Sequence, residues 1–281
     1  MRTTARVRGV SDRAHAWVDH REPGSRSATA IDVWRRYREV DGPLQSALLS
    51  LYVVVAIVPA LLVTEEFFDS NPAALGHHLA HHYHLNGAAA TLVQSVLASN
   101  KEHELGSGLF AIVGALVFGV GFGRVLQVVH SRAWRVRIDA GIIDQILFGG
   151  ILVALYGLIV LLLFQLNDLK SPPLWLEIPL SLGWIVVLVL FFDLAPWLLL
   201  HKQVSARDLM PGAVLTAIGL VVLMVISSFV MPLWVDLYAR DYGGLGVVLA
   251  MYFWLAFSSA TIVMAASISP ALAARRAARS A

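Results

Sequence analysis

The chain has 281 residues, of which 58% are hydrophobic and only 14% charged, and its formal net charge is +2. Because soluble domains carry about a quarter charged residues, this composition excludes an ordinary soluble protein. The absence of cysteine excludes disulfides, thiolate metal sites and cysteine nucleophiles. The first apolar run begins near Leu44, too far from the start for a cleavable signal peptide, so it is expected to act as an uncleaved anchor.

Residues 1–30 are rich in Arg, Ser and Ala and lack a periodic apolar face, which predicts a disordered basic cytoplasmic arm. In residues 31–40, Ile31, Trp34 and Tyr37 recur at helical spacing beside arginines, which predicts a short interfacial helix, with disorder as the alternative. We expect the arm to contact anionic lipid headgroups and not nucleic acid, because it has no aromatic interleaving and no known nucleic-acid motif.

Six apolar runs follow, each long enough for the roughly 20 residues that a helix needs to cross the ~30 Å hydrocarbon core. They cover residues 44–64, 107–129, 142–165, 174–200, 211–235 and 244–268. Because lipid cannot satisfy free backbone groups, these runs are expected to be helices. The fourth contains Pro179 and Pro196 and is expected to tilt or kink. The predicted fold class is therefore all-α, a polytopic membrane protein with six transmembrane helices.

The basic residues predict the orientation of these spans. Nine arginines precede the first run, and further basic clusters follow the second, fourth and sixth runs, the last of them in a basic tail at 271–281. The remaining loops hold only Lys101, Lys170 and Arg240. By the positive-inside rule, both termini are expected in the cytoplasm.

The loop at 65–106 is predicted on the outer side and is rich in histidine. Its paired residues at helical spacing are His77 with His81 and His78 with His82. Such i, i+4 imidazoles are compatible with zinc or copper if a further ligand is supplied, and they are also compatible with a pH-responsive surface. The leading interpretation is an exposed polar face on an interfacial helix. No other cofactor is indicated.

Three ionisable residues inside the predicted spans stand out: Arg124, Asp144 and Asp193. Charges within a bilayer cost about 2.5–3.5 kcal/mol each on insertion scales, which makes them candidates for function. All three are expected in the cytoplasmic half of the bilayer and could meet inside the bundle. Two interpretations are open: a site for an ion, a proton or an anionic headgroup, and a static ion pair with Arg124 and Asp144 reaching toward the interface.

Small residues at helical spacing predict faces for close helix packing in the second and third spans. They form two stripes: Ala115, Gly119 and Gly123 in the second span, and Gly150, Ala154 and Gly157 in the third. The glycines of the second span lack the strand–turn–helix context of a phosphate loop, so no nucleotide site is predicted.

Several motifs follow one another in order along the chain. The segment 208–213 opens the fifth span, 242–246 precedes the sixth, and Trp254 lies within the sixth. Their residues are Asp208, Pro211, Gly212, Tyr242, Gly243, Gly246 and Trp254. A motif at 123–127, leading to 133–136, and Pro59 agree with them. Taken in this order, the motifs resemble the YihY/BrkB family of bacterial inner-membrane proteins, once labelled ribonuclease BN. The resemblance covers roughly residues 31–270 and implies a six-helix domain in a bacterial inner membrane.

The resemblance has one departure. Where the family carries Gly-Ala-Glu near the end of the sixth span, this chain has Ala265-Ala266-Ser267. No catalytic residues are assigned, because no soluble catalytic domain and no carboxylate cluster suited to metal-assisted phosphodiester cleavage is visible. The first functional hypothesis is a transporter of an ion, a small molecule or a lipid, supported by intramembrane charge and by two three-helix halves of necessarily inverted topology. The alternative is a non-transporting envelope scaffold or lipid-organising protein. Oligomeric state is not specified by the sequence.

Overall fold

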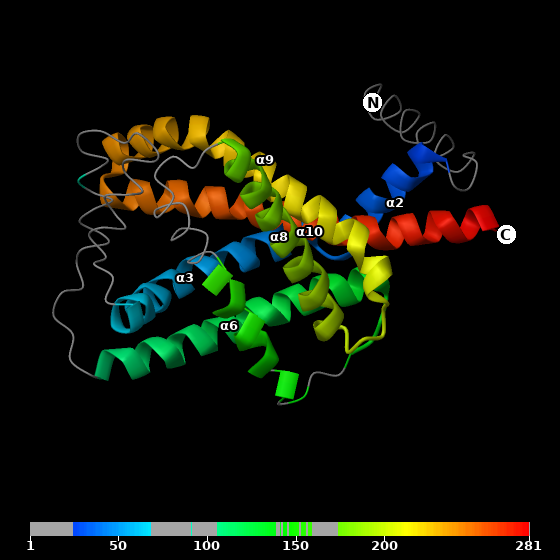
Figure 1. Ribbon diagram of the computed structural model, residues 1–281, viewed down its shortest axis with the longest axis horizontal. Coiled ribbons are helices and arrows are strands. Elements are labelled where there is room, and N and C mark those ends of the chain that lie inside the picture. The colour runs from blue at the N-terminus through cyan, green and yellow to red at the C-terminus, as the bar shows by residue number, and fades with distance from the viewer. Residues whose placement is uncertain are drawn as a thin grey trace, which may run out of the picture.

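The computed structural model of the protein is helical wherever it describes an element (Figure 1). It describes residues 25–68, 91, 106–138, 141, 143–144, 146–151, 153–155, 157–158 and 174–280, and no strand occurs in these ranges. The all-α prediction is therefore confirmed for the described part of the chain. The predicted outer-loop histidines and most of residues 1–30 lie outside it.

The described helices are α2 (Arg26–Glu39), α3 (Gly42–Phe68), α6 (Gly106–Trp134), α8 (Leu174–Leu199), α9 (Ala206–Tyr242) and α10 (Gly244–Ser280). All of them except α2, which is polar, coincide with apolar runs. The described residues from 143 to 158 are also helical. Helices therefore occupy five of the six predicted spans, except that Leu200 at the end of the fourth forms a turn. In the remaining span, the third at 142–165, the described residues are helical.

Among the described residues, three helices are long and apolar enough to cross a membrane: Leu182–Leu199, Ala206–Tyr242 and Gly244–Ala278. Shorter apolar helices cover Gly42–Ala56 and Ile146–Leu155. Helices α9 and α10 each contain 37 residues, which corresponds to about 55 Å at 1.5 Å per residue. Both continue beyond the predicted spans, because intrahelical hydrogen bonding does not stop where the sequence becomes polar.

The helices form one elongated bundle. Helix α9 packs along α10, α3 lies beside α6, and α10 also contacts α3 (Figure 1). The last turns of α10 and the C-terminal end of α6 lie at the same end of the bundle as α2. The main apolar core includes Leu49, Phe122, Phe148, Ala213 and Val263, so helices from all along the chain contribute to it. We call the end of the bundle that carries α2 the α2 end.

The small-residue stripe of α6 lies at a close helix contact, as predicted. A Cβ atom added to Gly119 would lie 2.8 Å from the Cα atom of Gly149. The stripe predicted on the following helix does not make this contact, because Gly150 and Gly157 have open space around their Cα atoms and Ala154 is exposed. The neighbouring residue Gly149 packs there instead, since the helix is rotated from the predicted face.

Helix α2 begins at Arg26, five residues before the predicted interfacial helix at 31. The side chain of Ser25 caps it by accepting a hydrogen bond from the backbone N–H of Ala28 at 3.1 Å. Residues 26–30 are therefore helical, although the sequence predicted them as part of a disordered arm. The basic residues predicted as a C-terminal tail lie on α10, which continues to Ser280.

Candidate functional site

Asp193 on α8 is a buried carboxylate whose Oδ1 atom has no hydrogen-bond partner among the residues that the structure describes. Asp193 is next in sequence to Phe192, a residue of the apolar core, and it is 9% exposed. The Oδ1 atom is fully buried and receives no hydrogen bond. An unpaired polar group in an apolar interior costs free energy. Of the described residues, Asp193 is therefore the one whose position is hardest to explain by a contribution to stability.

A small cavity lies between α6, α8, α9 and α10 next to this part of α8. Its polar walls include His130, Thr216 and Ser269, together with Trp134. Nδ1 of His130 donates to the carbonyl of Leu126 at 2.9 Å, because a carbonyl oxygen only accepts. The Nε1–H of Trp134 has no acceptor. The cavity measures about 10 Å³, which is room for about one water molecule, so the bundle has no open passage here.

Asp144 lies near the start of the helix that begins at 143, and it has two partners. Its Oδ1 accepts from Nε2 of His201 at 2.6 Å, and its Oδ2 accepts from the backbone N–H of Gly141 at 2.5 Å. The second bond resembles the return half of a capping box, in which a carboxylate in the first turn of a helix accepts a hydrogen bond from a backbone amide just before the helix. Asp144 therefore ties the start of this helix to the end of α8.

An open groove of about 550 Å³ surrounds this pair. Its polar lining consists of Asp144, His201, Lys202 and the backbone of Gly141. Its apolar walls are Ile143, Leu147 and Leu198. The groove is amphipathic, and it opens where α8 ends and the chain turns toward α9.

The three ionisable residues singled out in the sequence do not pair with one another in the described part of the chain. Arg124 is exposed on α6, and it forms no ion pair with Asp144 or Asp193 in the described part of the chain. Asp144 pairs with His201, which is 57 residues away in sequence and was not among the predicted site residues. The only sequence signal for His201 was its position just after the fourth apolar run.

The Asp208–Gly212 motif opens α9 and joins it to α10. Ser205 caps the helix, and its hydroxyl donates to Oδ2 of Asp208 at 2.9 Å. Pro211 lies in the second turn, where its ring removes one backbone donor. The backbone N–H of Gly212 donates to the hydroxyl of Ser269 at 2.6 Å, and a Cβ atom on Gly212 would collide with that hydroxyl. The motif therefore permits close approach of α10.

The second motif forms the turn between α9 and α10. Tyr242 is the last residue of α9, and Gly243 ends the helix with a φ of 60°. A Cβ atom on Gly246 would collide with the backbone carbonyl of Tyr238. Trp254 lies further along α10 and is partly buried. The geometry of this motif accounts for a tight entry into α10.

Near the end of the sixth span, the residue that departs from the family pattern is buried. Ser267 is fully buried on α10, and its hydroxyl donates to the carbonyl of Val263 in the same helix at 3.3 Å. No ionisable group therefore occupies this position in the bundle.

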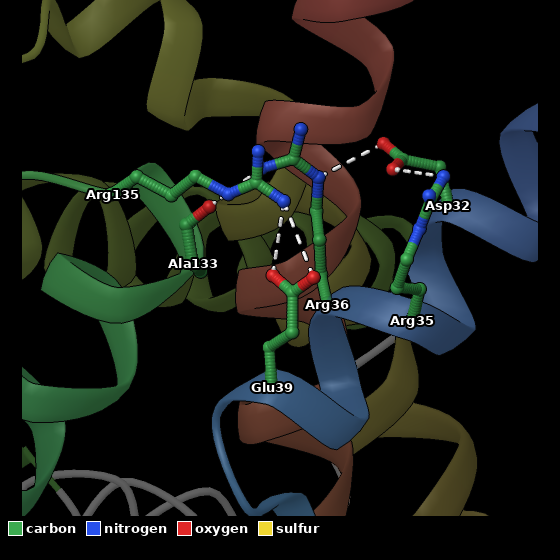
Figure 2. A network of polar contacts seen from close by, with 6 residues as sticks. All are labelled: Asp32, Arg35, Arg36, Glu39, Ala133 and Arg135. Carbon is green, nitrogen blue, oxygen red and sulfur yellow. Dashed lines mark hydrogen bonds and ion pairs between the residues drawn. The ribbon is translucent and has the colours of Figure 1, made fainter.

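Arg36 and Arg135 attach α2 to the end of α6 (Figure 2), and a third arginine attaches the turn that follows α2. Arg36 donates to the backbone carbonyl of Ala133 at 2.8 Å and pairs with Asp32 at 2.9 Å. Arg135 reaches both carboxylate oxygens of Glu39, at 3.1 and 3.2 Å. The third is Arg132, which pairs with Asp41 at 2.9 Å. Because the last carbonyls of a helix carry partial negative charge, Arg36 is well placed at the end of α6.

The paired histidines His77, His78, His81 and His82 lie outside the described residues. Within the described ranges, no group of three or more histidine, aspartate or glutamate side chains is arranged to hold a metal ion.

The comparison with known proteins agrees with the motifs. Residues 33–281 match the family described as virulence factor BrkB. The chain is also 28% identical over 105 residues to the ribonuclease-like protein YfkH of Bacillus subtilis (strain 168). That match spans 36% of this chain and 36% of the relative, so the chain aligns with only about a third of it. No solved structure matches. Since the family match covers most of the chain and all of its described membrane-length helices, the protein belongs to the virulence factor BrkB family.

Proposed function

We propose that the protein is a bacterial inner-membrane transporter that moves an ion, a small molecule or a lipid. In this proposal six transmembrane helices cross the bilayer, and both termini are cytoplasmic. No catalytic activity and no cofactor are part of the proposal, and the partners are membrane lipids with anionic headgroups, without nucleic acid. The ribonuclease-like description of the relative carries little weight for this chain because it aligns with about a third of that protein.

The α2 end supports the cytoplasmic placement. Arg36, Arg132 and Arg135 all lie there, and the C-terminal turns of α10 lie at the same end. Basic residues flanking spans favour the cytoplasmic side. A return of the chain to this end after the last span requires an even number of crossings, in agreement with six.

Asp193 is the observation that carries the transport proposal. Ionisable residues inside membrane spans are rare and mark pathways for ions and substrates. A static ion pair would require a partner, and the buried Oδ1 of Asp193 has none. Because the nearby cavity has room for only about one water molecule, transport would require α8 to move relative to α9 or α10.

The prolines in these helices favour such movement. Pro196 in α8, Pro211 in α9 and Pro270 in α10 each remove an intrahelical hydrogen bond. Pro196 also lines the cavity, so the weakened turn of α8 lies beside it. Helices interrupted in this way are a feature of transporters.

The alternative function is a non-transporting envelope scaffold or lipid-organising protein. The Asp144–His201 pair and the arginines that attach α2 favour it, because both are compatible with a static bundle. Under this alternative, Asp193 remains inaccessible to water in every conformation.

A single-cysteine experiment distinguishes the two functions, because the chain has no natural cysteine. Asp193→Cys is labelled in membranes with a membrane-impermeant thiol reagent added from either side. Leu194→Cys is the matched control, since Leu194 has nearly the same depth on α8 but is 52% exposed and faces outward from the bundle. His78→Cys and Ala278→Cys report the two sides of the membrane.

If Asp193→Cys is labelled and Leu194→Cys is not, the result would support a water-accessible pathway and transport. If Asp193→Cys stays dark while the two side reporters react, the transport proposal fails and the scaffold function replaces it. Labelling of Ala278→Cys from outside the cell would overturn the proposed orientation.

A further inference from the structure

The turns at the α2 end share an unusual backbone conformation. Among the described residues, four that are not glycine have positive φ angles, and all four are ionisable: Asp41, Arg135, His201 and Lys202. Such angles are uncommon for residues with a Cβ atom and cost free energy. Where they cluster, they point to a region in which a function is worth seeking.

Three of the four side chains have ionic partners within the protein. The pairs are Asp41–Arg132 at 2.9 Å, Arg135–Glu39 at 3.1 Å and His201–Asp144 at 2.6 Å. Lys202 has no carboxylate partner in the described part of the chain. Its Nζ atom lies over the ring of Trp197, 4.9 Å from the centroid. Lys202 therefore has the strained geometry of its neighbours without the anion that they have.

Lys202 also lines the open groove of about 550 Å³. The one carboxylate among the described lining residues, Asp144, already accepts hydrogen bonds from His201 and Gly141, so both of its oxygens have partners within the protein. The ammonium group of Lys202 is the charge that remains for a ligand. The opposite wall is apolar, and Ile143 on that wall is 82% exposed.

We propose that this groove binds an anionic phospholipid, with Lys202 on the phosphate and the acyl chains along Ile143, Leu147 and Leu198. Lys202 lies three residues beyond the apolar stretch Leu182–Leu199, so under the proposed membrane placement it lies near the end of a span, where lipid headgroups are found. Basic pockets between transmembrane helices on the cytoplasmic side are known to suit such headgroups. The inference rests on the membrane placement in the proposed function, but it does not depend on whether the protein transports anything.

The test uses the full chain in detergent micelles and measures lipid binding by native mass spectrometry. Phosphatidylglycerol is the probe, phosphatidylcholine is the zwitterionic comparison, and glycerol phosphate is the headgroup alone. Lys202→Gln removes the charge. Arg207→Gln is the matched control, because Arg207 is an exposed cation nearby that does not line the groove.

We expect Lys202→Gln to bind phosphatidylglycerol about fivefold more weakly, the effect of one basic residue near an anionic surface. Lys202→Arg retains the charge and should retain binding, which separates lost binding from lost folding. Ile143→Asn should weaken phosphatidylglycerol without changing the response to glycerol phosphate. Since Ile143 is largely exposed, this change leaves the core intact.

Three results would overturn the proposal: no preference for phosphatidylglycerol over phosphatidylcholine, equal losses for Lys202→Gln and Arg207→Gln, or glycerol phosphate binding as tightly as the lipid. If phosphatidylglycerol binds at the groove while Asp193→Cys remains unlabelled, the lipid site stands and the transport proposal fails. If Asp193→Cys is labelled but the protein shows no lipid preference, the transport proposal stands and the lipid site fails.

Discussion

The hydroxyl of Ser269 on α10 and the backbone nitrogen of Gly212 on α9 lie 2.6 Å apart. The same hydroxyl donates to the carbonyl of Leu209 at 3.1 Å, so one side chain bridges two turns of the neighbouring helix. We expect Ser269→Ala to lower the free energy of unfolding by about 1–2 kcal/mol, because two buried hydrogen bonds are lost. Equilibrium unfolding in detergent measures this.

Ser258→Ala is the control for that change. Ser258 lies on the same helix, but its hydroxyl donates only to Trp254 of α10 itself. We expect a change within about 0.5 kcal/mol. Equal losses at both positions would show that the bridge to α9 contributes nothing specific.

Asp193 and Asp144 should respond oppositely to the same substitution. Asp193→Asn removes a buried charge that has no partner, and we expect it to raise the free energy of unfolding by about 1–3 kcal/mol. Asp144→Asn weakens the bond to His201, and we expect a loss of about 1 kcal/mol, because solvent in the groove screens the pair. Equilibrium unfolding of both variants measures the signs, and a loss at Asp193 would reveal a stabilising partner.

Arg36 should matter more than its neighbour Arg35. Arg36→Ala removes the bonds to Ala133 and Asp32 from a side chain that is 12% exposed, and we expect a cost of about 1.5–3 kcal/mol. Hydrogen exchange along α2 measures it, since α2 should loosen from α6. Arg35→Ala affects a pair in which Arg35 is 62% exposed, so exchange should be unchanged; similar exchange in both variants would contradict the role of Arg36.

Gly119 and Gly150 provide a test of helix packing. Gly119→Ala places a methyl group against the backbone of Gly149, and we expect a cost of about 1–3 kcal/mol from overpacking. Gly150→Ala meets open space, and it should stabilise the helix by about 0.5–1 kcal/mol. Thermal unfolding of both variants measures the difference, and a gain at Gly119 would mean that the helices do not touch there.

Lys202 should show a conflict between stability and binding. Its φ of 60° costs a residue with a Cβ atom roughly 1–2 kcal/mol. We expect Lys202→Gly to raise the melting temperature, because the strain is removed, and to weaken phosphatidylglycerol binding. Lys202→Gln keeps the strain and loses the charge, so it should weaken binding without the gain in stability. Unchanged stability in Lys202→Gly would show that this backbone is unstrained.

The sequence located the helices well, because a run of apolar residues long enough for a bilayer has few other folded forms. It misplaced helix ends. The predicted fifth span ended at 235, whereas α9 continues to Tyr242 and ends where Gly243 takes a positive φ. Hydropathy marks where a helix leaves lipid, and backbone geometry marks where it stops. For the same reason α2 begins at Arg26, where Ser25 provides a cap.

The candidate site was predictable only in part. Asp144 and Asp193 were identifiable, since a carboxylate in an apolar run is conspicuous by its cost. Their partners were not, because pairing depends on which helix faces which. Arg124 was the expected partner, yet it is exposed, and His201 takes that place for Asp144.

The sequence by itself determined that this is an all-helical membrane protein of the BrkB family, because apolar run length and motif order are local properties of the chain. The tertiary structure alone decided that, among the described residues, Oδ1 of Asp193 has no partner and Lys202 lines a groove without a carboxylate paired to it. It also decided that Gly149 and not Gly150 meets Gly119. Each of these depends on the rotation of a helix about its axis, which is set by contacts between residues far apart in the chain.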